Sequence, residues 1–300
     1  MADVALSVPA ERQRLKQLEF YSFCVVSFVG KSILLIGLPY RDWPVNTFYT
    51  CSLLLFFYLY FRFRQGMRAP FYVLLALGSA VAVDILGNQK GLYGHPFGPL
   101  RDYDEFAHFA GSGLSAIAAF WLLRAGTLKM GVRLKPAVLT FLATTVAFAY
   151  CGWYEILELW DEWYWSHFER IHSWDDTPND LFYDFLGVIV VLAVAGVVVA
   201  LVSRREQSNL KPVGMTSLAA ALPKDLLTVF IVTTTFGLAA WFEIFRMFDQ
   251  IWSGRAHFVG FEDCAIRLQW ELAACVTLGL ICLAALKLST RARQGRRDPL

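Results

Sequence analysis

The stretch FLGVIVVLAVAGVVVALV, residues 185–202, decides the fold, because it holds 18 consecutive residues without a charge. A helix that crosses a bilayer needs about 20 mostly apolar residues. A second stretch, residues 226–242, is nearly as long and also uncharged. Both runs are continuously apolar, whereas the strands of a membrane barrel alternate between apolar and polar residues. The sequence therefore predicts an all-α, polytopic membrane helix bundle.

The composition agrees with a membrane location and narrows the classes of function. The 300 residues are 57% hydrophobic and 17% charged, with a mean hydropathy of +0.47. A soluble domain carries about 25% charged residues. The net charge of +2, without a basic patch interleaved with aromatic residues, excludes nucleic acid as an expected partner. The six cysteines form no CxxC pair, so we expect neither a disulfide framework nor a thiolate zinc site.

Eight segments are long and apolar enough to span a membrane. We predict spans at residues 20–38, 46–62, 70–87, 105–124, 135–160, 180–202, 225–250 and 264–288. Lys and Arg gather before the first span, in every second connection and after the last span. Because cytoplasmic loops carry the excess of Lys and Arg, both termini are predicted to be cytoplasmic. The predicted organisation is a cytoplasmic segment 1–19, a single transmembrane domain 20–288 and a basic cytoplasmic tail 289–300.

Ionisable residues in and directly beside these spans gather at the end that this orientation places outside the cytoplasm. They are Asp84, Asp104, His108, Glu155, Glu158, Asp161, Asp176, Asp180, Asp184, Glu243, Arg246, Asp249, Asp263, Arg267 and Glu271. Charged groups at such depth are costly in lipid, so we expect them to face the bundle interior or a watery cavity. Residues four apart share a helix face, which places Asp104 beside His108 and Asp180 beside Asp184.

The spacing of the acids predicts repeated helical hairpins. A first acid is followed by a second acid 20 or 21 residues later in the pairs Asp84 and Asp104, Glu155 and Asp176, and Glu243 and Asp263. In addition, CGWYEILELWD at 151–161 resembles AAWFEIFRMFD at 239–249. We therefore expect a hairpin unit that is present at least twice.

The two clearest copies differ in charge, and this difference indicates a cation site. Glu158 in the middle hairpin corresponds to Arg246 in the last hairpin, and Asp180 corresponds to Arg267. The last hairpin can therefore form Arg–carboxylate pairs, whereas the middle hairpin has an excess of acids near His108. Close carboxylates share protons or hold cations. A structural polar network between helices and a chain of proton-handling groups are the alternative interpretations.

The resulting hypothesis is a site for a divalent metal ion. The expected metal ligands are Asp104, His108, Glu155 and Asp180. Glu158 and Asp176 are the candidate catalytic groups, as general bases that act on a metal-bound water. The supporting residues are Asp84, Tyr103, Asp184, Glu243, Arg246 and Arg267. Oxygen ligands with one histidine suit Mg²⁺, Mn²⁺, Ca²⁺, Zn²⁺ or iron, and the sequence does not select among them.

Three motifs resemble those of a known group of membrane proteins. YDEFAHFAGSG (103–113), GWYEILELWDEW (152–163) and DDTPNDLFYDFLG (175–187) resemble the uncharacterised YjdF-like inner-membrane family and, more distantly, VanZ-like membrane proteins. The matched positions are Tyr103, Asp104, His108, Glu155, Glu158, Asp176, Thr177, Asp180 and Gly187. Asp184 and the last two spans depart from the pattern. The resemblance implies a shared site and a bacterial inner-membrane location, and it implies no particular reaction.

The sequence leaves three functions open. The first is a metal-dependent hydrolase or transferase that faces away from the cytoplasm and acts on a membrane lipid or lipid-linked substrate. The second is an ion- or proton-coupled transporter that uses the same acids, although only the Thr233–Thr235 run continues from them toward the cytoplasmic side. The third is a non-catalytic assembly factor. No oligomeric state is predicted.

Overall fold

The structure is a computed structural model that describes residues 19, 51–52, 54–165, 167, 175–203, 212–214, 224–254 and 263–295. The first predicted span, 20–38, lies outside this part of the chain. Of the second predicted span, 46–62, residues 54–59 are helical and continue into the π-helical turn η1, Tyr60–Arg64. The predicted count of eight spans therefore stays a prediction.

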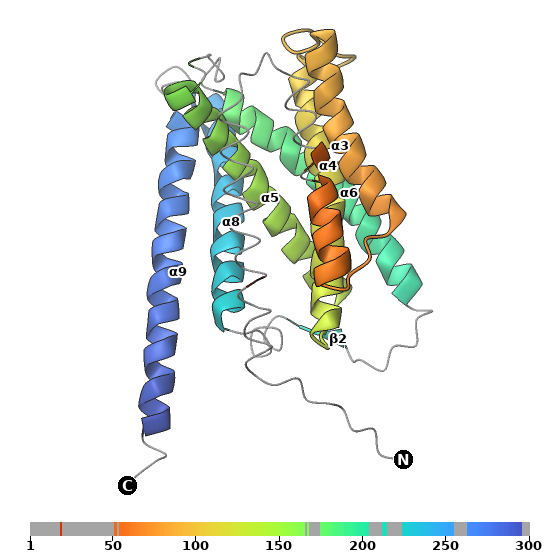
Figure 1. The fold of residues 1–300 in the computed structure, drawn as a ribbon. Helices are drawn as coiled ribbons and strands as arrows, with labels where there is room; N and C mark the ends of the chain where they lie inside the picture. Colours follow the sequence, from red (N-terminus) through yellow and green to blue (C-terminus); the bar gives the residue numbers. More distant parts are fainter. Residues whose placement is uncertain are drawn as a thin grey trace.

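Six long helices form the described bundle (Figure 1). They are α3 (Phe71–Lys90), α4 (Tyr103–Lys129), α5 (Pro136–Trp160), α6 (Asp176–Ser203), α8 (Lys224–Ser253) and α9 (Asp263–Gly295). Each contains a stretch that is long and apolar enough to cross a membrane. The prediction of an all-α membrane helix bundle is confirmed, and these helices correspond to predicted spans three to eight. The largest difference is at the end of α9, where Arg291, Ala292, Arg293 and Gln294 favour continuation of the helix beyond residue 288.

Consecutive helices run in opposite directions, so α4, α6 and α9 begin at the end of the bundle where α3, α5 and α8 finish (Figure 1). We call this end the acidic end, because the predicted site residues lie in the helix turns that meet there. A π-helical turn, η2 (Asp161–Trp165), extends α5 at this end. At the opposite end, β1 (Arg133–Leu134) pairs in parallel with β2 (Pro212–Val213). Two-residue strands carry no periodicity, so the sequence did not predict this pair.

Helix α5 lies between two hydrophobic clusters and so holds the described bundle together. Phe148 and Ile156 belong to a buried cluster that α5 forms with α6, α8 and α9. Leu142 and Ala143 belong to a second cluster that α5 forms with α4 and α6. The walls of the acidic end are therefore packed helices, and rigid elements of this kind can fix the side chains that they carry.

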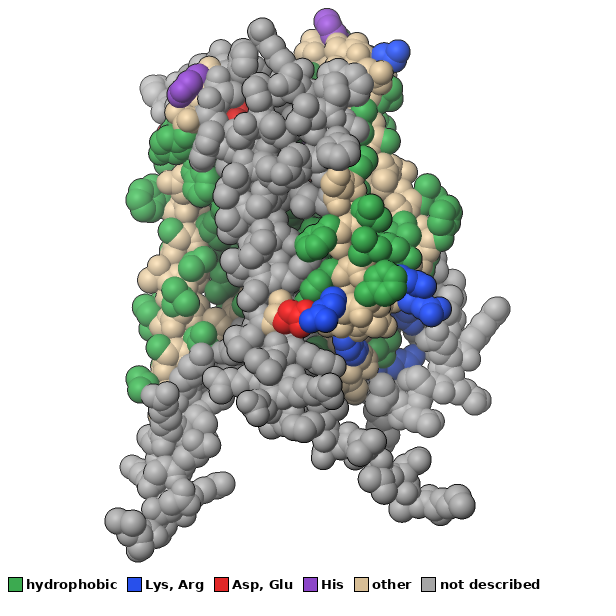
Figure 2. All heavy atoms as spheres, in the orientation of Figure 1, with side chains coloured by type: hydrophobic (Ala, Val, Ile, Leu, Met, Phe, Trp, Pro, Cys, Tyr) green, Lys and Arg blue, Asp and Glu red, His purple; other side chains and the backbone are tan. Residues whose placement is uncertain are grey.

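Large hydrophobic side chains on the outer faces of the helices remain exposed, as expected for surfaces in contact with lipid. Phe71 on α3, Phe242 and Trp252 on α8, and Trp270 on α9 are examples. Figure 2 shows hydrophobic side chains on the flanks of one face, with most of its basic side chains gathered toward the lower end. Which end of the bundle is cytoplasmic stays a prediction from the positions of Lys and Arg.

The start of α4 is fixed by a local cap. Asp102 is the N-cap residue, and its side chain accepts a hydrogen bond from the backbone N–H of Asp104 at 3.0 Å. The same carboxylate oxygen accepts a second bond from the N–H of Gly94 at 2.9 Å. A capping carboxylate satisfies backbone donors that the first turn leaves unpaired. The cap therefore sets where Asp104 and His108 stand on the helix.

Helices α4 and α6 approach each other closely at two glycines. A Cβ atom at Gly187 would collide with the carbonyl group of Phe109 on α4, and a Cβ atom at Gly113 would lie 2.8 Å from the carbonyl oxygen of Gly187. Ser112 donates a hydrogen bond across the same contact to the backbone oxygen of Asp184, at 3.1 Å. Small residues allow helix backbones to meet in this way inside membranes.

We expect Gly187→Ala to destabilise the bundle, because the new methyl group must push α6 away from the α4 backbone. Overpacking of this kind costs about 1–3 kcal/mol. Thermal unfolding of the detergent-purified protein measures the effect. Gly111→Ala is the matched control, since a Cβ atom at Gly111 meets nothing within 4 Å. Equal melting temperatures for both variants would contradict the close packing described.

Candidate metal centre

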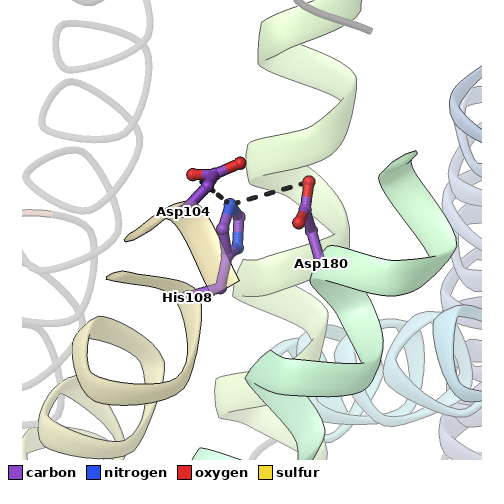
Figure 3. A group of neighbouring side chains, drawn as sticks. All are labelled: Asp104, His108 and Asp180. Atoms are coloured by element: carbon purple, nitrogen blue, oxygen red, sulfur yellow. Dashed lines mark ion pairs between the residues drawn. The ribbon is translucent and has the colours of Figure 1, made fainter. Parts of the chain in front are cut away.

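The imidazole of His108 lies among carboxylates from α4 and α6 (Figure 3). Its Nε2 atom is 3.6 Å from Oδ1 of Asp104 and 3.8 Å from Oδ2 of Asp180. Figure 3 shows the ring between these two side chains, with Asp104 and His108 on α4 and Asp180 on α6. Asp104 and His108 are four residues apart, so one helix face presents both, as predicted. We call Asp104, His108 and Asp180 the outer triad.

The other ring nitrogen of His108 faces a second pair of acids. Its Nδ1 atom lies 3.2 Å from Oδ1 of Asp184, within hydrogen-bonding distance. Glu155 on α5 completes a second group, in which one ligand atom from each of His108, Glu155 and Asp184 lies within 4.8 Å of the others. We call this the inner group. The four ligands predicted from sequence are thus divided between two groups that share His108.

The hydrogen bond to Asp184 determines which nitrogen of His108 can bind a metal. When Nδ1 donates its proton to Asp184, the lone pair of a neutral imidazole is on Nε2, which faces the outer triad. Metal-binding histidines commonly donate their second N–H to a carboxylate in this way. Asp184 is therefore a positioning residue for His108, and Ser112 in turn holds the backbone of Asp184.

Glu155 is the most deeply buried acid of the site. Only 1% of the residue is exposed, and its Oε1 atom has no hydrogen-bond partner among the described residues. An uncompensated buried charge of this kind costs several kcal/mol. Glu158, on the same helix, lies close enough for its charge to act on both Glu155 and Asp180, and Asp176 acts on Asp180. Glu158 and Asp176, the candidate bases predicted from the sequence, therefore lie near the acids of the candidate metal site.

Cys151 and Tyr154 also line the site, although sequence reasoning did not select them. The buried thiol of Cys151 lies 3.3 Å from the carbonyl oxygen of Ala147 and within hydrogen-bonding reach of Asp184. The ring of Tyr154 packs edge-on against His108, with 6.1 Å between ring centroids. Both residues precede Glu155 on α5. A buried cysteine usually behaves as a small hydrophobe, so its residue type gave no signal.

Two predicted supporting residues lie away from His108. The carboxylate of Asp84 accepts hydrogen bonds from Asn88 at 2.9 Å and from Tyr93 at 3.0 Å, and the residue is exposed on α3. The hydroxyl of Tyr103 donates to the backbone oxygen of Val83 at 2.7 Å. Both side chains therefore fasten α3 to its neighbours, and neither forms part of the two groups around His108.

A second polar network, which the sequence analysis missed, joins the starts of α4 and α6. Buried Glu105 accepts a bond from the backbone N–H of Arg101 at 2.9 Å and lies 3.4 Å from the amide nitrogen of Asn179. Arg101 also lies 3.7 Å from a carboxylate oxygen of Asp175. The i, i+4 spacing of Arg101 and Glu105 was the available signal. This network supports the outer triad by fixing the two helix starts that carry it.

The last hairpin holds an arginine–glutamate centre in place of a carboxylate cluster. Glu243 on α8 is 1% exposed and accepts hydrogen bonds from Nε of Arg267 on α9, at 3.1 and 3.0 Å, and from its Nη2. Nη1 of Arg246 donates to the same glutamate at 2.9 Å. The Arg–carboxylate pairing predicted for this hairpin is confirmed. Its buried acid is balanced by two guanidinium groups.

Comparison with known proteins identifies a family and nothing more specific. The model of a family described as predicted membrane protein (DUF2238) matches residues 20–201. This range contains α3, α4, α5 and both groups around His108, and it ends before α8 and α9. The YjdF-like resemblance of the motifs is consistent with this match, whereas the VanZ-like resemblance stays a prediction. No curated protein and no solved structure matched the chain.

We expect Arg267→Ala to destabilise the protein strongly, because it leaves Glu243 buried without its bidentate partner. Removal of one partner from a buried ion pair costs about 3–5 kcal/mol. The matched control is Arg246→Ala, whose side chain is 55% exposed and whose loss should cost less than about 1 kcal/mol. Chemical unfolding in detergent measures both. Similar losses for the two variants would refute the assignment of Arg267 as the main partner.

Proposed function

We propose that this chain, which belongs to the DUF2238 family of predicted membrane proteins, binds a divalent metal ion at the outer triad and uses it in hydrolysis or group transfer. The family and the six apolar helices place the chain in a membrane as a multi-pass protein. A bacterial inner membrane, with the acidic end facing out of the cytoplasm, is part of the proposal. The observation that carries it is the orientation of His108, whose Nδ1 faces Asp184 while Nε2 faces two further carboxylates.

The residues of the outer triad fit a metal ion. The ligand atoms of Asp104 and Asp180 lie 3.6 and 3.8 Å from Nε2 of His108. Metal–ligand bonds of about 2.0–2.6 Å would fit between atoms at these separations. Three protein ligands leave further coordination positions for water or substrate, as in catalytic metal sites. The side chain of Asp104 is 37% exposed, so the triad is open on that side.

A bound divalent ion would acidify a coordinated water and polarise a carbonyl or phosphoryl oxygen. Glu158 and Asp176 border the triad and are the proposed general bases. The base would take the proton from the water as the water oxygen bonds to the substrate. In hydrolysis it would then return that proton to the leaving oxygen as the bond between this oxygen and the carbonyl carbon or phosphorus breaks. In group transfer, the hydroxyl group of an acceptor molecule would take the place of the water.

The depth of the site supports a lipid or lipid-linked substrate. His108 lies five residues after Tyr103, the first residue of α4, which corresponds to about 8 Å along the helix. Asp180 lies four residues after the start of α6. These positions are close to the ends of membrane-spanning helices, at the level where a lipid head group meets its acyl chains. A head-group linkage would therefore reach the ion without leaving the membrane.

Transport has weaker support from the described residues. The hydroxyls of Thr233 and Thr235, the candidate continuation of an ion path, donate to carbonyl oxygens of their own helix at 2.8 and 2.7 Å. Such bonds hold the two hydroxyls on their own helix. Oγ1 of Thr234, between them, is buried without a hydrogen-bond partner among the described residues. A non-catalytic assembly role would require a fixed partner protein, and nothing in the described residues points to one.

We also infer that hairpins α5–α6 and α8–α9 are two copies of one unit. Their buried positions coincide: Phe148 with Phe236, Glu155 with Glu243, Ile156 with Ile244, Leu181 with Leu268, and Val188 with Cys275. Equivalent residues also meet where α5 packs against α8. A Cβ atom at Gly152 would lie 3.0 Å from the Cβ of Ala240, 88 residues later. Contact between equivalent positions is typical of units related by a two-fold axis.

Elemental analysis of detergent-purified protein tests the metal site. We expect a divalent metal ion in stoichiometric amount in the wild type, and its loss in His108→Ala and in Asp180→Ala, because each variant removes a ligand. Asp84→Asn is the matched control, since Asp84 is an acid of the same end that bonds Asn88 and Tyr93 instead of His108. Wild-type protein that holds no metal after dialysis against Mn²⁺ or Zn²⁺ would overturn the proposal.

A further inference from the structure

Glu155 and Glu243 occupy equivalent positions in the two hairpins and are equally buried, yet their surroundings have opposite charge. Each residue is 1% exposed. Two guanidinium groups reach Glu243, those of Arg246 and Arg267. At the positions of these two arginines the first hairpin carries Glu158 and Asp180, so carboxylates surround Glu155 where arginines surround Glu243.

We propose that a second cation, distinct from the ion of the outer triad, is bound in the inner group by the carboxylates of Glu155 and Asp184. This inference rests on the proposed function, because both cations adjoin His108. The inner cation takes the place of the guanidinium groups of hairpin α8–α9. It compensates the negative charge of Glu155 as Arg246 and Arg267 compensate that of Glu243.

Two independent observations support the inner cation besides the comparison of the hairpins. The Oε1 atom of Glu155 is buried and has no hydrogen-bond partner among the described residues, so the oxygen is available as a ligand. Ligand atoms of Glu155, Asp184 and His108 also lie within 4.8 Å of one another. Oδ1 of Asp184 lies 3.2 Å from Nδ1 of His108, and the Cys151 thiol is within hydrogen-bonding reach of the same carboxylate, so Asp184 would bind the ion through the oxygen lone pairs that these contacts leave.

The balance of charge leads to the same conclusion. Four acids lie around His108, namely Asp104, Glu155, Asp180 and Asp184. Glu158 also lies close enough to act on Glu155 and Asp180, and Asp176 on Asp180. An ion at the outer triad is held by Asp104, His108 and Asp180, and Oε1 of Glu155 stays buried without a hydrogen-bond partner among the described residues. Unpaired charge is costly within a membrane, so Glu155 needs a further cation. Carboxylate oxygens favour hard cations such as Mg²⁺, Ca²⁺ and Mn²⁺. The inner cation is therefore expected to be of this class.

The two hairpins also supply the variant that tests the inference. Arg246 follows Glu243 by three residues, and Glu158 follows Glu155 by the same interval. Glu158→Arg would therefore place a guanidinium group beside Glu155, in the relation that Arg246 has to Glu243. The guanidinium would replace the inner cation and leave the ligands of the outer triad in place. Glu158→Gln is the matched control, because it removes the same negative charge without adding a positive one.

The experiment counts Mn²⁺ ions per chain by equilibrium dialysis and elemental analysis of the full-length protein. We expect two ions in the wild type, one in Asp104→Ala, one in Glu158→Arg and one in Glu155→Gln, with two retained in Glu158→Gln. Chelator should lower the melting temperature of the wild type and lower that of Glu158→Arg by less, since the arginine takes over the role of the inner cation.

The possible outcomes separate the two proposals. A single ion that is lost in Asp104→Ala and retained in Glu158→Arg and Glu155→Gln would overturn the inner cation and leave the outer metal site standing. A single ion that is lost in Glu155→Gln and Glu158→Arg but retained in Asp104→Ala would overturn the outer metal site and leave the inner cation standing. Wild-type protein without bound Mn²⁺ would overturn both, and Glu155 would then carry a proton in place of a cation.

Discussion

A carboxylate buried among membrane-spanning helices requires a positive partner, because neither lipid nor a packed apolar core can solvate its charge. The described helices meet this requirement in two ways. In α8 and α9 the partner is covalently part of the chain, since Arg267 and Arg246 both bond Glu243. In α4, α5 and α6 the carboxylates of Asp104, Glu155, Asp180 and Asp184 lie around the imidazole of His108 instead of around a guanidinium group. We propose that a bound cation is the positive partner in this second arrangement.

The geometry of the cluster depends on the close approach of α4 and α6. Gly113 and Gly187 permit that approach, and Ser112 adds a hydrogen bond from α4 to the backbone of Asp184. The same contact brings the ring of His108 against Asp180 and Asp184, one on each side of the ring. Packing and chemistry are thus coupled here, because a change that separates the two helices also moves the carboxylates away from both nitrogens of His108.

The sequence was sufficient to predict the six described membrane-spanning helices and the residues that share a helix face. Those features depend on apolar length and on the helix period, which are local properties. Asp104 with His108 and Arg246 with Glu243 are pairs of this kind, and both are present in the structure. The charge difference between the two hairpins could also be found by aligning their sequences. It correctly predicted that Arg267 pairs with Glu243.

Properties that depend on distances between helices were beyond the sequence. The sequence could not show which predicted ligands face each nitrogen of the His108 ring. It also predicted only a supporting role for Asp184, although Asp184 orients that ring. It placed Asp84 near the site, whereas Asn88 and Tyr93 bond its carboxylate on α3. It omitted Cys151, because a cysteine in a helical stretch gives no signal until the neighbouring helix is known. It also omitted Glu105, although the i, i+4 spacing from Arg101 was a signal.

The central claim is that His108 binds a metal ion through Nε2 together with carboxylates. X-ray absorption spectroscopy of the Mn²⁺-loaded protein tests it most directly, because imidazole ligands give distinctive scattering beyond the first shell. We expect a shell of oxygen atoms with one imidazole nitrogen in the wild type, and loss of the imidazole signal in His108→Ala. A spectrum with oxygen ligands alone, the same in both proteins, would contradict it.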